Sequence, residues 1–219
     1  MDILILAIIA GAVLWRLIRT FGQMSDNVSK TLTAEYAILD ERSEHVQHIQ
    51  KQYEQEQLMK LESSLPARAL EVLRVAEMRL KGFNITIFLD GARKAYEMLM
   101  LAIANADMET IKHLVTPELQ ANYKKALEDL KRQRYTQDLL FIGINKSEVR
   151  KGELSGNTKD GTISFTVYFE SEVVNAILDK SGAVVEGNAK KIYVCKHNLT
   201  FVKELDSKDS MWLITESDI

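Results

Sequence analysis

Hydrophobic and polar positions divide the chain into three stretches of different pattern. From Ile3 to Trp15 no residue is charged, and Arg16 and Arg19 follow closely. Residues 21 to about 62 are polar and rich in Gln, Glu and Lys. Beyond them, apolar residues recur first at helical spacing and later at alternating positions. The pattern predicts an apolar segment (1–20), a polar helical spacer (21–64) and a folded domain (65–219).

The apolar segment is best interpreted as a transmembrane signal anchor. As a helix, residues 3–18 would be about 24 Å long, slightly short of the roughly 30 Å of bilayer hydrocarbon. A signal peptide remains an alternative, although the Met-Asp start has no cation and no Ala-x-Ala site follows. A buried core helix is a second alternative, but the segment has no polar face. The residues expected to form the anchor are Ile3, Leu4, Ile5, Leu6, Ile8, Ile9, Val13, Leu14, Trp15, Arg16 and Arg19.

The charges beside the anchor predict its orientation. Arg16 and Arg19 both follow the apolar run, so the positive-inside rule leaves the rest of the chain in the cytoplasm. Cys195 is the one cysteine, which excludes an intrachain disulfide and agrees with a reducing compartment. The net charge of −3 argues against a nucleic-acid binder.

The spacer is composed mostly of good helix formers. Its apolar residues recur at close to 3.5-residue spacing, with gaps at Glu35 and Arg42. Two interpretations remain open: a solvated helical or partly disordered spacer, and a helix that docks on a partner helix.

The first half of the domain shows helical periodicity. We expect helices over about 65–81, 85–105, 107–115 and 117–134, with Asp107 as a cap and Pro117 in a first turn. The first helix should bury Leu65, Ala69, Val72, Leu73, Ala76 and Leu80.

The second half has strand periodicity. A strand begins near residues 139–144, and residues 163–170 alternate between apolar and polar. Residues 192–195 and 199–202 form another strand, and residues 211–214 close the series. We expect turns at Gly152, Gly156-Asn157, Asp160-Gly161, Ser181-Gly182 and residues 206–209. Helices followed by consecutive strands predict an α+β fold, with helices packed on one face of a curved antiparallel sheet.

The domain resembles the C-terminal domain of the mitochondrial import-motor adaptor, the forty-four-kilodalton subunit of the inner-membrane translocase, and especially its α-proteobacterial relatives. The resemblance rests on Phe83, the run FLDGARKAY (88–96), ANAD (104–107), the strand FTVYF (165–169), GAVVEG (182–187), and LTF (199–201) followed by WLI (212–214). The chain departs from the family at 196–199, KHNL, where an Asp and a Trp usually precede Thr-Phe. The family's chaperone-binding region has no match in residues 21–62.

The resemblance implies a cone of helices on a bent sheet, similar to the nuclear-transport-factor fold, with an apolar cavity. It also implies association with acidic phospholipids such as cardiolipin, location at the bacterial inner membrane, and an adaptor role. Five aromatic residues are expected mostly in the core, with some lining a pocket: Phe88, Tyr96, Phe165, Phe169 and Phe201.

No catalytic or metal-binding signature occurs, so we expect no enzyme, no cofactor and no metal. His45 and His48 have helical spacing but no third ligand, and Cys195 and His197 share a strand face without an orienting group. A cationic group on the helix over 117–134 has two interpretations, a solvated mixed-charge face or a contact for anionic lipid headgroups. It comprises Lys124, Lys125, Lys131, Arg132 and Arg134, and Arg68 and Arg74 form a second such surface.

These observations favour a membrane-anchored adaptor that holds an unidentified protein partner or client polypeptide at the cytoplasmic face of the membrane. A lipid-binding module that uses the cavity and the basic surface is the alternative. An enzyme on the same fold is a third hypothesis, because cone folds support varied chemistry.

Overall fold

The computed structural model describes residues 52, 55–56, 58–159, 161–207 and 211–219. The chain divides into two compact units, residues 1–59 and 60–219. The predicted anchor (1–20) and the spacer up to residue 51 lie outside the described residues, whereas residues 58–64 are helical. Among the residues that are described, no helix is both long and apolar enough to cross a membrane.

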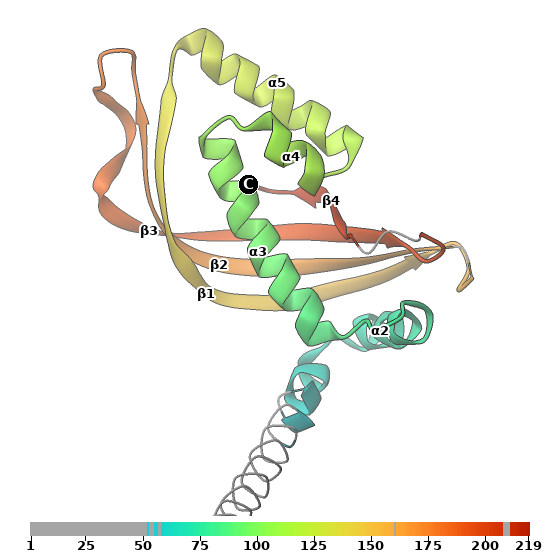
Figure 1. The fold of residues 1–219 in the computed structure, drawn as a ribbon. Coiled ribbons are helices and arrows are strands. Elements are labelled where there is room, and N and C mark those ends of the chain that lie inside the picture. The colour runs from blue at the N-terminus through green and yellow to red at the C-terminus, as the bar shows by residue number, and fades with distance from the viewer. Residues whose placement is uncertain (1–51, 53–54, 57, 160, 208–210) are drawn as a thin grey trace, which may run out of the picture. The chain divides into compact units, whose positions relative to one another are not determined.

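The domain consists of four helices followed by four strands. The helices are α2 (Ala67–Arg79), α3 (Ile85–Ala104), α4 (Met108–Leu114) and α5 (Pro117–Gln133). The strands β1 (Thr136–Ser155), β2 (Thr162–Leu178), β3 (Val184–Glu204) and β4 (Leu213–Ser217) pair antiparallel in chain order. In Figure 1 the three long strands bend around α3, α4 and α5. The predicted α+β class with helices on a curved antiparallel sheet is therefore confirmed.

The bend of the sheet has a local cause in the strand register. The β1–β2 ladder shifts register at three points, between Phe141 and Gly143, Ile144 and Lys146, and Val149 and Lys151. The β2–β3 ladder shifts at two more. Each such bulge bends its strand and increases its twist. Long strands can thus curve around the helices instead of extending as a flat sheet.

The helices cover one face of this sheet. Along β2, the side chains of Ile163, Phe165, Val167 and Phe169 are fully buried, while the residues between them are half-buried. From the helical side, α3 buries Phe88, Leu89, Ala92, Tyr96 and Leu99 against them. The six residues predicted to form the buried face of the first helix are all buried.

Capping or first-turn residues begin three of the helices, and two of these, Asp107 and Pro117, were predicted. The Asn84 side chain accepts hydrogen bonds from the backbone N–H groups of Thr86 and Ile87 at the start of α3. Asp107 caps α4 by accepting from the N–H of Thr110 at 3.1 Å, as predicted. Pro117 begins α5. A backbone N–H at this first position would have no partner within the helix, so proline costs no hydrogen bond there.

The predicted turn at Gly152 is wrong, because this glycine lies inside β1. A Cβ atom at Gly152 would stand 2.7 Å from the Cα of Ala69 on α2. Its role is therefore to let α2 approach the strand closely. The strands are also longer than predicted, and β3 is continuous through 184–204.

This close approach yields a prediction. We expect Gly152→Ala to lower the free energy of unfolding by about 1–3 kcal/mol, because α2 must move to accept the methyl group. Gly143→Ala is the matched control in the same strand, since a Cβ there meets no atom within 4 Å. Urea denaturation of both variants measures the difference. Equal stability of the two would contradict the close-packing explanation.

Candidate functional site

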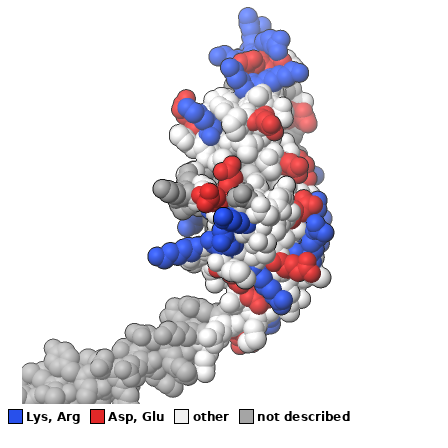
Figure 2. Space-filling model, turned by 90° about the vertical axis from the view of Figure 1, so that its right-hand side faces the viewer, with Lys and Arg blue, Asp and Glu red and all other residues white. Residues whose placement is uncertain are grey.

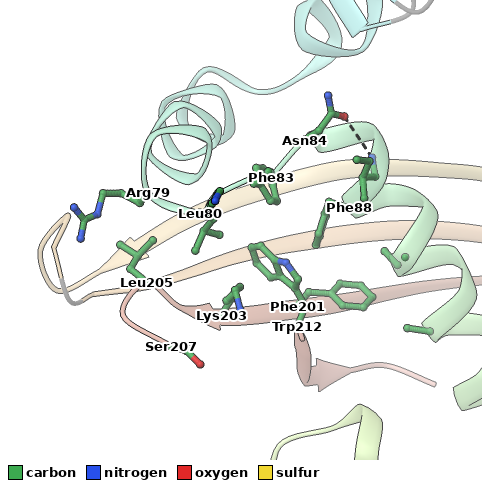
Figure 3. Close-up of a pocket in the computed structure, with 16 residues that line it drawn as sticks. Arg79, Leu80, Phe83, Asn84, Phe88, Phe201, Lys203, Leu205, Ser207 and Trp212 are labelled. Carbon is green, nitrogen blue, oxygen red and sulfur yellow. Dashed lines mark hydrogen bonds between the residues drawn. The ribbon is translucent and has the colours of Figure 1, made fainter. Parts of the chain in front are cut away.

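An open cavity of about 660 Å³ lies between the start of α3 and the β3–β4 end of the sheet. Its walls come from the α2–α3 connection, α3, β3 and the segment before β4 (Figure 3). We call it the aromatic pocket, and its larger apolar lining residues are Leu80, Phe83, Ile87, Phe88, Phe201, Leu205 and Trp212. Among these residues Ile87 is 66% exposed, so the rim presents an aliphatic side chain to solvent.

The floor of the aromatic pocket is a cluster of contacting rings. The Phe88 ring centroid lies 4.8 Å from that of Trp212 and 5.7 Å from that of Phe201. The Phe83 ring lies 5.7 Å from Trp212. Ring pairs at these separations attract one another beyond the burial of their surface. The floor is therefore packed into a fixed shape.

Cationic side chains border this apolar floor. Arg79 and Lys81 line the pocket from the end of α2, and Arg79 also donates a hydrogen bond to the carbonyl of Lys159. Lys203 on β3 is 8% exposed, and its Nζ lies 3.4 Å from the carbonyl oxygen of Met211. The pocket thus combines aromatic walls with a positive border.

Only some of the predicted pocket residues meet in this cavity. Phe88 and Phe201 line it, and Phe165 lies behind them with its ring 5.3 Å from that of Phe88. Tyr96, farther along α3, and Phe169 on β2 are fully buried, and their rings stack 4.5 Å apart. Phe88 and Phe201 are the only predicted pocket residues among those that line the aromatic pocket, and the unpredicted ones include Phe83, Ile87 and Trp212.

A buried polar network lies beside the Tyr96–Phe169 stack. The Tyr96 hydroxyl is 2.7 Å from Ser171 Oγ and 2.9 Å from His197 Nδ1. Burial raises the pKa of Tyr96 to about 12. Burial lowers the pKa of His197, and the charge of Asp218 opposes that effect. These groups partner one another, so the geometry explains them as a satisfied polar cluster within the core.

A second cavity, of about 800 Å³, lies where α3 and α5 end and β1 begins. We call it the α3–α5 groove. It brings together three of the predicted basic residues, Lys124, Lys131 and Arg134. Its other lining residues are Ile103, Ala104, Asn105, Ala106, Met108, Leu127, Glu128, Leu130, Tyr135, Thr136 and Gln137. Figure 2 shows lysine and arginine side chains gathered, with some acidic ones, at the end of the domain where α5 lies in Figure 1.

The remaining predicted basic residues do not line this groove. Lys125 and Arg132 are exposed on α5, and Arg132 pairs with Asp129. Arg68 and Arg74 are exposed on α2 and line neither cavity. The basic residues were predicted to form common surfaces, but in the fold some lie at the rim of the groove and the others lie on open surface.

The described residues offer little for metal or nucleophilic chemistry. Within them, no three His, Cys, Asp or Glu side chains lie close enough together to hold a metal ion. Cys195 is half-buried opposite Ser171, and burial raises the pKa of its thiol, which disfavours the thiolate. His45 and His48 lie outside the described residues.

Comparison with known proteins places the domain in a family. The sequence profile of the Tim44-like domain matches residues 69–219, so the chain belongs to the Tim44-like domain family. Membership supports an adaptor role associated with protein translocation or assembly. Among solved structures, the intermembrane-space region of the chloroplast protein ARC6 is similar at 12% identity and a TM-score of 0.40, over 59% of this chain and 93% of that one. No curated protein matches the chain.

The half-buried His197 predicts how stability depends on pH. Its folded-state pKa is below the usual 6.5, so the unfolded chain binds a proton more readily than the folded one. The free energy of unfolding should therefore fall as pH drops below about 6.5, until His197 also titrates in the folded state. Urea denaturation at about pH 7.5 and about pH 5 should show a smaller loss for His197→Gln than for the unchanged protein. An equal loss in both would refute this assignment.

Proposed function

We propose that this protein is a non-catalytic adaptor, anchored by residues 1–20 in the bacterial inner membrane with its domain in the cytoplasm. There it holds a partner protein or a client polypeptide, in protein translocation or in membrane-protein assembly. Family membership and the charge order after the apolar segment support this proposal.

The aromatic pocket is the observation that carries the proposal. It is open, it has rigid aromatic walls, and its rim exposes an aliphatic residue, Ile87. Buried aromatic anchors in pockets of this kind dominate the energy of protein interfaces. An apolar side chain of a partner polypeptide would be desolvated in this pocket. Because the walls are already rigid, binding would lose little conformational entropy of the pocket itself.

The lining also supports binding over catalysis. The ionisable side chains that line the aromatic pocket are Arg79, Lys81 and Lys203. General acid–base catalysis needs a group that exchanges protons near the working pH, most often a histidine or carboxyl group. No such group is among the lining residues.

Substitution at the pocket rim tests the adaptor function. We expect Ile87→Glu to weaken partner capture about tenfold or more, because it places a charge where an apolar side chain should dock. Met98→Glu is the matched control, since Met98 is 48% exposed on the same helix and lines neither cavity. The measurement is crosslinking and mass spectrometry of the full-length protein in its native membrane. Equal crosslinking by both variants would argue against the pocket as the docking site.

Lipid binding is the second candidate, because exposed cations such as Lys124 and Arg79 line cavities that also have apolar walls. Each cation near an anionic membrane surface contributes about 1 kcal/mol. We expect residues 65–219 to float with vesicles that contain cardiolipin, less so at high salt, and not with zwitterionic vesicles. If the domain floats with neither kind of vesicle, lipid binding is refuted and binding of a protein partner remains as the proposed function.

A further inference from the structure

The α3–α5 groove has an apolar floor that the fold leaves partly exposed. Ile103, Met108, Leu130 and Tyr135 line it and are only half-buried. Partly exposed apolar surface of this kind is stabilised when a partner covers it. The floor thus offers a contact surface for an apolar side chain of an occupant.

The cations on the rim are spread along α5 rather than concentrated. Lys124 and Lys131 are seven residues apart, which is two helical turns or about 10.5 Å. Arg134 follows α5 directly as its C-cap. Among the described residues, none of the three has an ion-pair partner. All three are exposed and available to an anionic occupant.

Glu128 divides this rim into two cationic positions. It lines the groove between Lys124 and Lys131, four residues after one and three before the other, so the three share one helix face. An anion centred between the lysines would face the Glu128 carboxylate. The arrangement therefore suits two separated carboxylates better than one phosphate headgroup, and this favours a polypeptide over a lipid.

Backbone conformation at the groove supports a binding role. Ala106 and Arg134 are the two non-glycine residues with positive φ in the described chain, at 52° and 59°, and both line the groove. Glycine adopts this conformation without strain and is the common residue at this helix end. An arginine here retains a rim cation at the expense of backbone strain, and such strain concentrates at functional sites.

We propose that the α3–α5 groove binds an acidic segment of a partner polypeptide, whose carboxylates lie about 10 Å apart on either side of an apolar side chain. That spacing corresponds to positions i and i+7 of a helix. The inference rests on the proposed adaptor function and specifies the chemistry of its partner.

A synthetic peptide tests this inference on the full-length protein in zwitterionic nanodiscs. The probe is a fluorescein-labelled helical peptide with two Glu seven residues apart and leucines between them, and binding is measured by anisotropy. Lys124→Glu combined with Lys131→Glu should weaken binding about tenfold. Lys125→Glu is the matched control, because Lys125 is an exposed lysine of the same helix outside the groove. Glu128→Gln should tighten binding.

Arg134→Gly separates binding from a purely structural role. The substitution should raise the denaturation midpoint, because glycine adopts the positive φ without strain. It should nevertheless lower the affinity for the peptide, because the rim loses a cation. The proposal is overturned if the double variant and Lys125→Glu bind alike, or if a peptide with Gln in place of both Glu binds equally well. It is also overturned if anionic vesicles, and not the peptide, bind in a Lys124-dependent manner. If the groove test fails but Ile87→Glu still weakens partner capture, the adaptor function stands and only this inference fails.

Discussion

The structure depends on the fit between α3 and the middle of β2. Phe88 and Tyr96 are eight residues apart on the helix, about 12 Å, and Phe165 and Phe169 are four apart on the strand, about 13 Å. Because these spacings nearly agree, ring pairs form at both ends, with centroids 5.3 Å and 4.5 Å apart. Ala92, buried between them, is small enough to let the helix lie close to the sheet.

This contact also determines where the cavities lie. At the N-terminal end of α3, Phe83 and Trp212 extend the ring cluster, and their edges form the floor of the aromatic pocket. At the C-terminal end, α3 stops at Ala104 and leaves the groove beneath α5. Between the two cavities the sheet face is filled by side chains, including the polar cluster of Tyr96, Ser171 and His197.

The sequence predicted those features that depend on neighbours within a few residues. Helix periodicity, the Asp107 cap and the alternation along β2 are local patterns, and each agrees with the structure. Gly152 was misplaced because a turn and a close approach both favour glycine, and only the position of Ala69 distinguishes them. The aromatic pocket was incompletely predicted because Phe83 and Trp212 are 129 residues apart in sequence. Sequence patterning gives no sign of their contact.

The two cavities lie at opposite ends of one helix, and this arrangement bears on how an adaptor would bind. Ile87 and Ile103 are sixteen residues apart on α3, about 24 Å along a rigid element. A partner that engaged both cavities would bind the second one intramolecularly, at an effective concentration set by the chain between its two contacts. Two modest contacts, one apolar and one ionic, would then suffice for stable capture. Their separation along α3 would also select partners by the spacing of their motifs.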